Sequence, residues 1–131
     1  MAYLSKDDIL AAADLPTEDV EVPEWGGTVR VQGMSGEQRD AFEASIQKKT
    51  ADGSMELDAL DFRAKLAARV MVDEKGARLF TNSEVKQLSK KSAKPLQRIF
   101  EVGQRLSGMS DDDVASLEGN SGGQSDASTT A

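Results

Sequence analysis

The spacing of apolar residues is helical in the central stretch, residues 57–109, which holds most of the large apolar side chains. Phe62, Leu66 and Val70 stand one helical turn apart and predict an apolar stripe on a first helix. Residues 73–76 form a turn, and a second apolar run follows. Because amphipathic helices must bury their stripes against each other or against a partner, we expect this stretch to organise the domain.

Capping residues mark the starts of the predicted helices. Ser, Thr or Asp followed three residues later by an acidic or amide side chain is typical of a capping box, which satisfies free backbone N–H groups at a helix start. The pattern predicts helix starts at Ser5, Ser35, Asp58, Thr81 and Ser110. We also expect Phe80 to be a core residue between the helices on either side of the central turn.

Proline sets two of the helix limits. The first helix should end before Pro16, because the residue before a proline avoids helical geometry. The helix after Ser35 should continue over residues 39–49. Pro95 is tolerated only in a first helical turn, so we expect two helices there, at about 83–91 and 93–107, with a bend between them.

Residues 19–32 change to a two-residue period. Valines alternate with charged residues on both sides of a glycine-containing loop, which predicts a short β-hairpin. Trp25, the only tryptophan, lies in that loop. It either folds back onto the core or stays exposed as an anchor for a partner protein, because tryptophan is enriched at binding hot spots.

These elements predict a mainly α fold. We expect a small domain at residues 1–118 with about five to six short helices and one β-hairpin near the N-terminus. Residues 119–131 carry no large apolar side chain and are rich in Gly and Ser. Such a segment cannot bury enough surface to offset the entropy of ordering, so we expect a flexible, disordered tail.

Composition and charge then exclude several classes of function. The chain has no cysteine and no histidine, which excludes disulfides and thiolate or imidazole metal sites. Its net charge of −7 argues against a general nucleic-acid-binding protein, which needs a basic surface. No apolar run approaches the ~18 residues of a membrane span. The balance favours a protein that binds other proteins, with no cofactor.

The acidic residues offer little chemistry. Residues 111–113 are three consecutive aspartates, but they lack the alternating ligands of a calcium loop and are placed where a helix start favours negative charge. Asp73, Glu74 and Asp52 are candidates for an acid–base pair, although nothing in the sequence places them in one pocket. We therefore expect no enzymatic activity, and no catalytic or metal-binding residue.

Five basic residues form a locally positive segment in this chain of negative net charge. Lys86, Lys90, Lys94 and Arg98 are each four residues apart, and Lys91 adds a further charge. On a continuous helix they would share one face. The set is either an ordinary solvated face or a docking surface for an acidic partner. That partner could be another protein or the acidic face of a second copy of this chain.

Five short segments stand out by their order and spacing. They read VPEWGGTVRV at 22–31, SGEQRDAFE at 35–43, DEKGARLFT at 73–81, LSKKSA at 88–93 and LQRIF at 96–100. Together they resemble the tail assembly chaperones of long-tailed, siphovirus-type bacteriophages.

The resemblance implies a largely helical protein that works in the host cytoplasm during infection and is absent from the mature virion. Such proteins bind the tape measure protein, keep it soluble and help to recruit tail tube subunits. The alternative is a structural part of the virion, such as a minor tail protein or a head–tail connector, which purified particles would contain.

Truncation of the chain after Gly119 should leave the melting temperature nearly unchanged, because the removed residues have nothing to bury. Thermal unfolding of the full and shortened chains measures this. A fall of many degrees would mean that the tail docks on the domain.

The basic residues should support weak self-association of the protein into rings or spirals. Contacts between exposed charges are weak and are screened by salt, so the association should fall as ionic strength rises. It should be lost when Lys90 and Lys94 are both changed to Glu. Sedimentation across a salt series tests this, and a wild-type monomer under every condition would contradict it.

Overall fold

The computed structural model describes residues 2–119. It is 47% helical and 18% strand, so the prediction of helices is confirmed, but the strand content is higher than a mainly α fold would have. In chain order the elements are α1 (Lys6–Ala11), β1 (Thr17–Val22), the 3-10 helix η1 (Pro23–Trp25), β2 (Gly27–Gln32), α2 (Gly36–Ser45), β3 (Gln47–Lys49), β4 (Met55–Leu57), α3 (Phe62–Val70), β5 (Met71–Val72), the 3-10 helix η2 (Asn82–Glu84), α4 (Val85–Leu88), α5 (Ala93–Leu106) and α6 (Asp111–Leu117).

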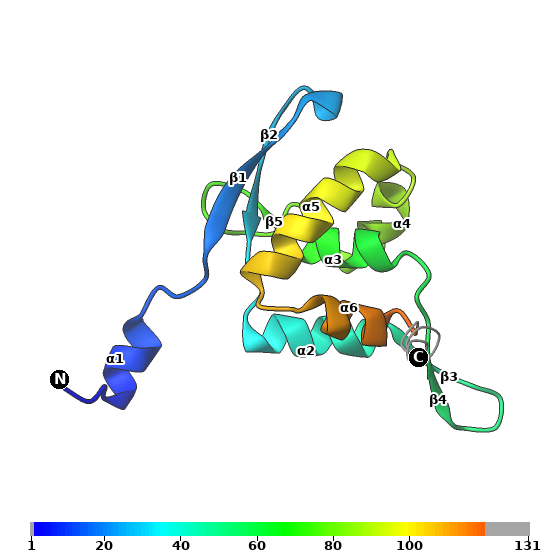
Figure 1. Cartoon of the computed structure of the whole chain (residues 1–131), viewed down its shortest axis with the longest axis horizontal. Helices are drawn as coiled ribbons and strands as arrows, with labels where there is room; N and C mark the ends of the chain where they lie inside the picture. Colours follow the sequence, from blue (N-terminus) through cyan, green and yellow to red (C-terminus); the bar gives the residue numbers. More distant parts are fainter. Residues whose placement is uncertain (1, 120–131) are drawn as a thin grey trace, which may run out of the picture.

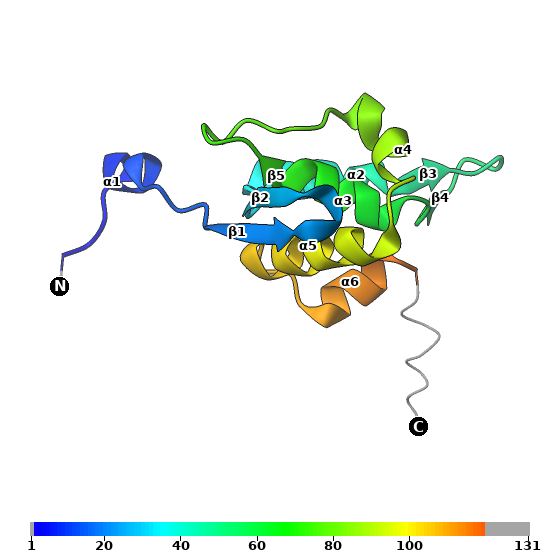
Figure 2. The ribbon, with the colours of Figure 1, turned by 90° about the horizontal axis from the view of Figure 1, so that it is seen from above.

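The predicted hairpin is present as β1 and β2. The two strands are antiparallel, in a register that runs from Thr17 opposite Gln32 to Val22 opposite Gly27. Gly26 turns the chain after η1 with a φ of 77°, a conformation that glycine adopts without strain. The short strand β5 adds to β2, so that the sheet has the order β1-β2-β5. Figures 1 and 2 show α5 lying along this sheet.

Helix α3 lies at the centre of the core. Six of its nine residues are buried, and they include three alanines at positions 64, 67 and 68. It packs against α2, α4 and α5, and β5 continues directly from its end. Alanine allows close approach of neighbouring helices because it has almost no side chain to hold them apart. The central stretch therefore organises the domain, as its apolar spacing predicted.

Two glycines lie where there is no room for a side chain. A Cβ on Gly103 of α5 would lie 2.9 Å from a methyl carbon of Val70 on α3. A Cβ on Gly33, just after β2, would overlap the carbonyl oxygen of Leu106 at the end of α5. The second contact is to main chain, which cannot rotate away, so Gly33 fixes how closely the sheet meets the end of α5.

Three phenylalanines join the helices through the core. The ring centroids of Phe42 and Phe62 are 5.5 Å apart, and those of Phe62 and Phe100 are 5.6 Å apart, both in tilted geometry. Such pairs gain energy beyond the area that they bury. All three rings are almost fully buried, whereas Phe80 is only partly buried at the edge of the core. The role expected of Phe80 therefore belongs to Phe62.

The predicted capping boxes at Ser5, Ser35 and Ser110 are confirmed, and each has both reciprocal bonds of the motif. At Thr81 the N–H donates to the Glu84 carboxylate, while the Glu84 N–H donates to the main-chain carbonyl of Thr81. These bonds join residues only three apart, so the local sequence is enough to specify them. Pro95 also lies in the first turn of α5, where the sequence placed it.

Several predicted boundaries are wrong. The helix expected over residues 39–49 ends at Ser45, and β3 follows it and pairs with β4 in a second hairpin. Asp58 does not begin α3; its carboxylate accepts a bond from the Leu60 N–H, and Asp61 precedes the helix in a left-handed conformation with a φ of 59°. The helix expected over residues 83–91 is shorter, because it consists of η2 followed by the single turn of α4.

Two segments project from the body at opposite ends, α1 and the β3–β4 hairpin (Figures 1 and 2). Helix α1 has no buried residue. The predicted tail lies outside the described residues from position 120 onward.

Phe62→Ala should destabilise the protein by about 3–5 kcal/mol, as is usual for the loss of a core phenylalanine. Phe80→Ala should cost roughly 1–2 kcal/mol, because only part of its ring leaves water. Leu79→Ala, at an exposed neighbouring position, is a control that should cost less than about 0.5 kcal/mol. Denaturant unfolding measures all three, and equal losses for Phe62 and Phe80 would contradict this ordering.

Candidate partner-binding surface

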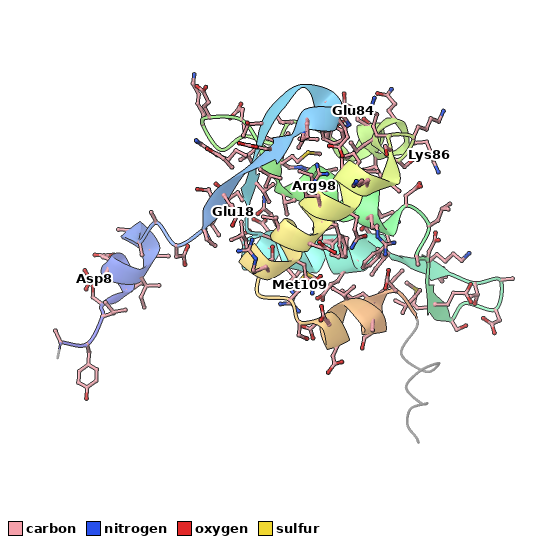
Figure 3. All side chains as sticks on the ribbon, turned by 45° about the horizontal axis from the view of Figure 1, so that its top comes forward. Asp8, Glu18, Glu84, Lys86, Arg98 and Met109 are labelled. Atoms are coloured by element: carbon pink, nitrogen blue, oxygen red, sulfur yellow. The ribbon has the colours of Figure 1, made fainter. Side chains whose placement is uncertain are left out.

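The five basic residues do not share one continuous helix. Lys86 is on α4, Lys90 and Lys91 are in the turn that follows, and Lys94 and Arg98 are on α5. Figure 3 labels Lys86 and Arg98, at the two ends of this set. We call the five residues the basic cluster. The bend between α4 and α5, which the position of Pro95 led us to expect, separates the cluster into two parts.

Two members of the basic cluster are engaged within the chain. The Lys86 ammonium lies 2.6 Å from a carboxylate oxygen of Asp61, the left-handed residue before α3. The Arg98 guanidinium donates two bonds of 2.8 Å to the carboxylate of Glu24 in η1. These pairs tie α4 to α3 and the tip of the β1–β2 hairpin to α5.

The forked bond from Arg98 lowers the pKa of Glu24 to about 2. Its charge, together with the more distant charge of Lys94, favours the ionised carboxylate. Glu24 is therefore charged at any physiological pH, and it neutralises Arg98. Both side chains remain partly exposed, at 31% each, so water screens the pair.

The other three members are not neutralised by ion pairs within the described part of the chain. Lys90, Lys91 and Lys94 are exposed, and none makes an ion pair with another residue in the range 2–119. The acidic groups nearest in sequence have other partners, because Glu84 accepts a bond from the Thr81 N–H and Glu101 accepts one from the Gln97 side-chain amide.

Trp25 is partly buried and packs against the edge of the core, while the rest of its side chain stays exposed. The sequence left packing on the core and exposure as alternatives, and each describes part of the side chain. Its remaining surface lines a groove of about 240 Å³, whose walls are formed by Trp25, Phe80, Gln87, Leu88 and Lys91. We call this the tryptophan groove. It is smaller than the roughly 300–1,000 Å³ of typical small-molecule sites. Lys91 places one member of the basic cluster at its rim.

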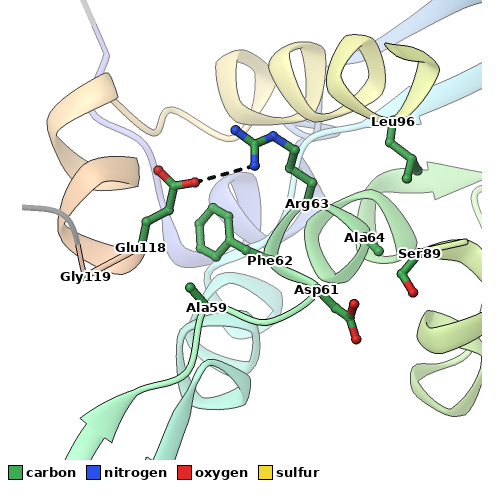
Figure 4. Close-up of a pocket in the computed structure, with 9 residues that line it drawn as sticks. All are labelled: Ala59, Asp61, Phe62, Arg63, Ala64, Ser89, Leu96, Glu118 and Gly119. Carbon is green, nitrogen blue, oxygen red and sulfur yellow. Dashed lines mark ion pairs between the residues drawn. The ribbon is translucent and has the colours of Figure 1, made fainter. Parts of the chain in front are cut away.

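A larger depression of about 500 Å³ lies beside the start of α3 and reaches Gly119 (Figure 4). Its charged side chains are already paired. Arg63 lies 3.8 Å from Glu118 and stacks over the Phe100 ring at 5.6 Å, and Asp61 is paired with Lys86. The Arg63–Glu118 pair joins α3 to the end of α6, and the Asp61–Lys86 pair joins the start of α3 to α4.

The acidic candidates have structural roles. Asp73 accepts bonds from the N–H groups of Lys75 and Ala77, and so closes the turn after β5. Asp52 accepts bonds from Thr50 and Ser54 in the β3–β4 turn, and these bonds hold its pKa well below the ordinary value. The two turns lie at opposite ends of the molecule (Figures 1 and 2), so the proposed acid–base pair is not formed.

Two of the three aspartates in the first turn of α6 are engaged in the same way. Asp113 completes the capping box at Ser110 and lies 3.4 Å from Arg39, while Asp111 accepts a bond of 2.8 Å from Gln104. Within residues 2–119, no group of three or more acidic side chains is arranged to hold a metal ion. None of the helices in this range is long and apolar enough to cross a membrane.

The sequence did not reveal that the N-terminal helix would lie uncovered by the rest of residues 2–119. Leu4, Ile9 and Leu10 are 72%, 57% and 75% exposed, and Tyr3 is almost fully exposed. Five of the nine large exposed apolar residues of the described range lie in the first 15 positions. The sequence showed a short helix with apolar residues. Only the packing shows that these residues stay uncovered by the rest of the described chain.

Comparison with solved structures places the fold among known ones. The tail assembly chaperone of bacteriophage HK97 superimposes with a TM-score of 0.54 and 23% sequence identity, over 74% of this chain and 92% of that one. At this identity the likeness shows a shared fold. No curated protein matches the sequence.

The family comparison covers most of the described residues. Residues 9–117 match the family of phage tail assembly chaperones. The match begins inside α1 and includes both the tryptophan groove and the basic cluster. Membership of a chaperone family implies a non-enzymatic role. The chain belongs to the phage tail assembly chaperone family.

Proposed function

We propose that the protein binds the tape measure protein of its phage, keeps it soluble and helps to recruit tail tube subunits during tail assembly. The observation that carries the proposal is the family match over residues 9–117. In this proposal the protein acts in the host cytoplasm during infection and is absent from the finished virion.

The described surface suits a partner with apolar segments. A long helical protein that awaits assembly has an apolar seam that must be covered, and helix-in-groove contacts are a common way to cover one. The tryptophan groove offers apolar walls of the required kind. Lys91 lines the groove, and it supplies, with the other exposed lysines of the basic cluster, positive charge for an acidic flank of the partner.

Weak contacts between copies fit the same role. A chaperone of 131 residues covers only a short length of a much longer chain, so several copies must bind in a row. Copies that touch their neighbours raise one another's effective concentration on the same partner.

Co-expression with the tape measure protein of the same genome should increase its soluble fraction and allow the two to be purified together. The double variant Lys90→Glu, Lys94→Glu should recover less complex, because two positive charges next to the groove become negative. The matched control is Lys49→Glu, Lys75→Glu, which makes the same change in charge at exposed positions outside the basic cluster and should behave as wild type.

An insoluble tape measure protein in the presence of the wild-type chain would contradict the proposed function. Equal recovery with both double variants would leave the basic cluster as an ordinary solvated surface. Mass spectrometry of purified virions separates the chaperone from the structural alternative, since a minor tail or connector protein would be found in the particles.

A further inference from the structure

Strand β1 is the outer strand of its sheet, and only one of its two edges is paired. The sheet has the order β1-β2-β5, and Figure 2 shows β1 on the side of the sheet opposite β5. Pro16 precedes the strand and Pro23 follows it, and neither can donate a main-chain bond. The open edge is therefore a window of six residues, which is about 20 Å long.

The main-chain bonds of β1 show which of its residues face the open edge. The Gly33 N–H donates to the Pro16 carbonyl, so every second residue from Pro16 exchanges bonds with β2 in the antiparallel ladder. The residues between them direct both main-chain groups outward, and these residues are Thr17, Asp19 and Glu21. Their N–H and C=O groups make no main-chain hydrogen bond to another residue in the range 2–119.

The open edge has none of the features that usually protect an edge strand from pairing. The three residues that face it are exposed. The register of β1 against β2 is continuous over all six residues, so no bulge twists the edge away, and no proline lies within the strand. A row of free donors and acceptors of this kind is a template for one more strand.

The charges on the outer face of the sheet determine which strand fits. Asp19 and Glu21 lie there, because Val20 and Val22 point into the core. Asp19 is paired with Arg30 at 3.0 Å, but Glu21 makes no ion pair in the described part of the chain. A second copy of β1 would place its own carboxylates against these, which is unfavourable. The charges therefore select a different protein, with basic residues at alternate positions.

The inner face of the sheet supplies the other half of the pattern. Helix α5 lies along this face and is held to the hairpin by two ion pairs, Arg105 with Glu18 and Arg98 with Glu24; Figure 3 labels one residue of each pair, Glu18 and Arg98. Val102 is three residues from Arg105 and four from Arg98, so it shares their side of the helix, and it is only partly buried. Apolar side chains of an added strand would cover it.

We propose that the open edge of β1 binds an extended segment of another protein, antiparallel to β1, whose residues alternate between apolar and basic. Main-chain bonds provide the affinity, and the two sets of side chains provide the selectivity. The antiparallel direction continues the pairing of the existing sheet and is the more stable one. The site shares no residue with the tryptophan groove, and the proposal does not rest on the proposed function.

A synthetic eight-residue peptide of alternating valine and lysine tests the proposal on the full chain, with its affinity measured by fluorescence anisotropy. In the antiparallel arrangement the lysines lie opposite Thr17, Asp19 and Glu21, and it is their N–H groups that bond to β1. A peptide with N-methylated lysines should bind at least tenfold more weakly, whereas one with N-methylated valines should bind as the unmodified peptide does. Equal binding of all three peptides would overturn the proposal, and this comparison leaves the protein unchanged.

Two proline variants make the same comparison on the protein. Glu21→Pro removes an outward N–H that β2 does not use, so the hairpin should be retained. The matched control is Thr28→Pro, at the exposed residue opposite Glu21 on β2, whose N–H faces away from β1 and lies outside the pairing with β5. Glu21→Pro should raise the dissociation constant of the peptide at least tenfold and Thr28→Pro should not. Equal effects of the two variants would contradict the proposal.

The charge of the edge is tested separately. Glu21→Thr removes the same carboxylate as Glu21→Pro but keeps the N–H, so it should weaken binding less, and its effect should disappear at high salt because only an exposed charge is lost. The variant Thr17→Lys, Glu21→Lys should prefer a peptide of alternating valine and glutamate. Continued preference for the lysine peptide would overturn the assignment of a basic partner.

Amide hydrogen exchange locates the contact. In the protein alone the Asp19 and Glu21 amides should exchange rapidly, and saturating valine–lysine peptide should slow them at least tenfold, while the Val20 amide, already bonded to β2, should change little. If the Asp19 amide is protected without peptide, and more so at higher protein concentration, a second copy occupies the edge and the proposal is overturned. None of these experiments contains tape measure protein, so their outcome is independent of the proposed function.

Discussion

Burial of α3 is the constraint on which the rest of the structure depends. The helix is surrounded by packed elements, and only small residues permit this on several sides at once. Its alanines allow close approach, Gly103 of α5 leaves room for Val70, and Phe62 fills the space between Phe42 and Phe100. The three-stranded sheet is attached to the same unit, because β5 is the direct continuation of α3.

Elements specified by neighbouring residues were predictable from the sequence. The capping boxes join residues three apart, and the β1–β2 hairpin shows its alternation within 14 positions, so both could be placed without knowledge of the fold. The β3–β4 hairpin was not predictable in this way. Its strands are exposed and only three residues long, and the first of them, Gln47–Lys49, is entirely polar, so no apolar alternation marks the pair.

Asp58 shows how tertiary structure changes a local signal. It has the right spacing for a helix cap, but its carboxylate is used two residues later, at Leu60. The helix begins only after Asp61, whose left-handed backbone is stabilised in place by the ion pair with Lys86 on α4. That pair joins residues 25 positions apart, and no reading of the local sequence reveals it.

The candidate surface was predictable only in part. Trp25 and the lysines were recognisable by residue type, because each stands out from its surroundings. The groove was not, since its walls come from the hairpin tip, from Phe80 and from α4, which only the fold brings together. The pairing of Arg98 with Glu24 was equally hidden, and it divides the basic cluster into residues that hold the domain together and residues that face outward.

The capping box of α1 has a consequence for how well this exposed helix is ordered. A helix of six residues is marginal in water when nothing packs on it. The reciprocal bonds of Ser5 and Asp8 favour the helical form even though α1 has no buried residue. These bonds lower the pKa of Asp8, so the box is complete above the ordinary pKa of an aspartate and is lost only as the pH falls through the lowered value. The helix therefore stays capped throughout the pH range of a living cell.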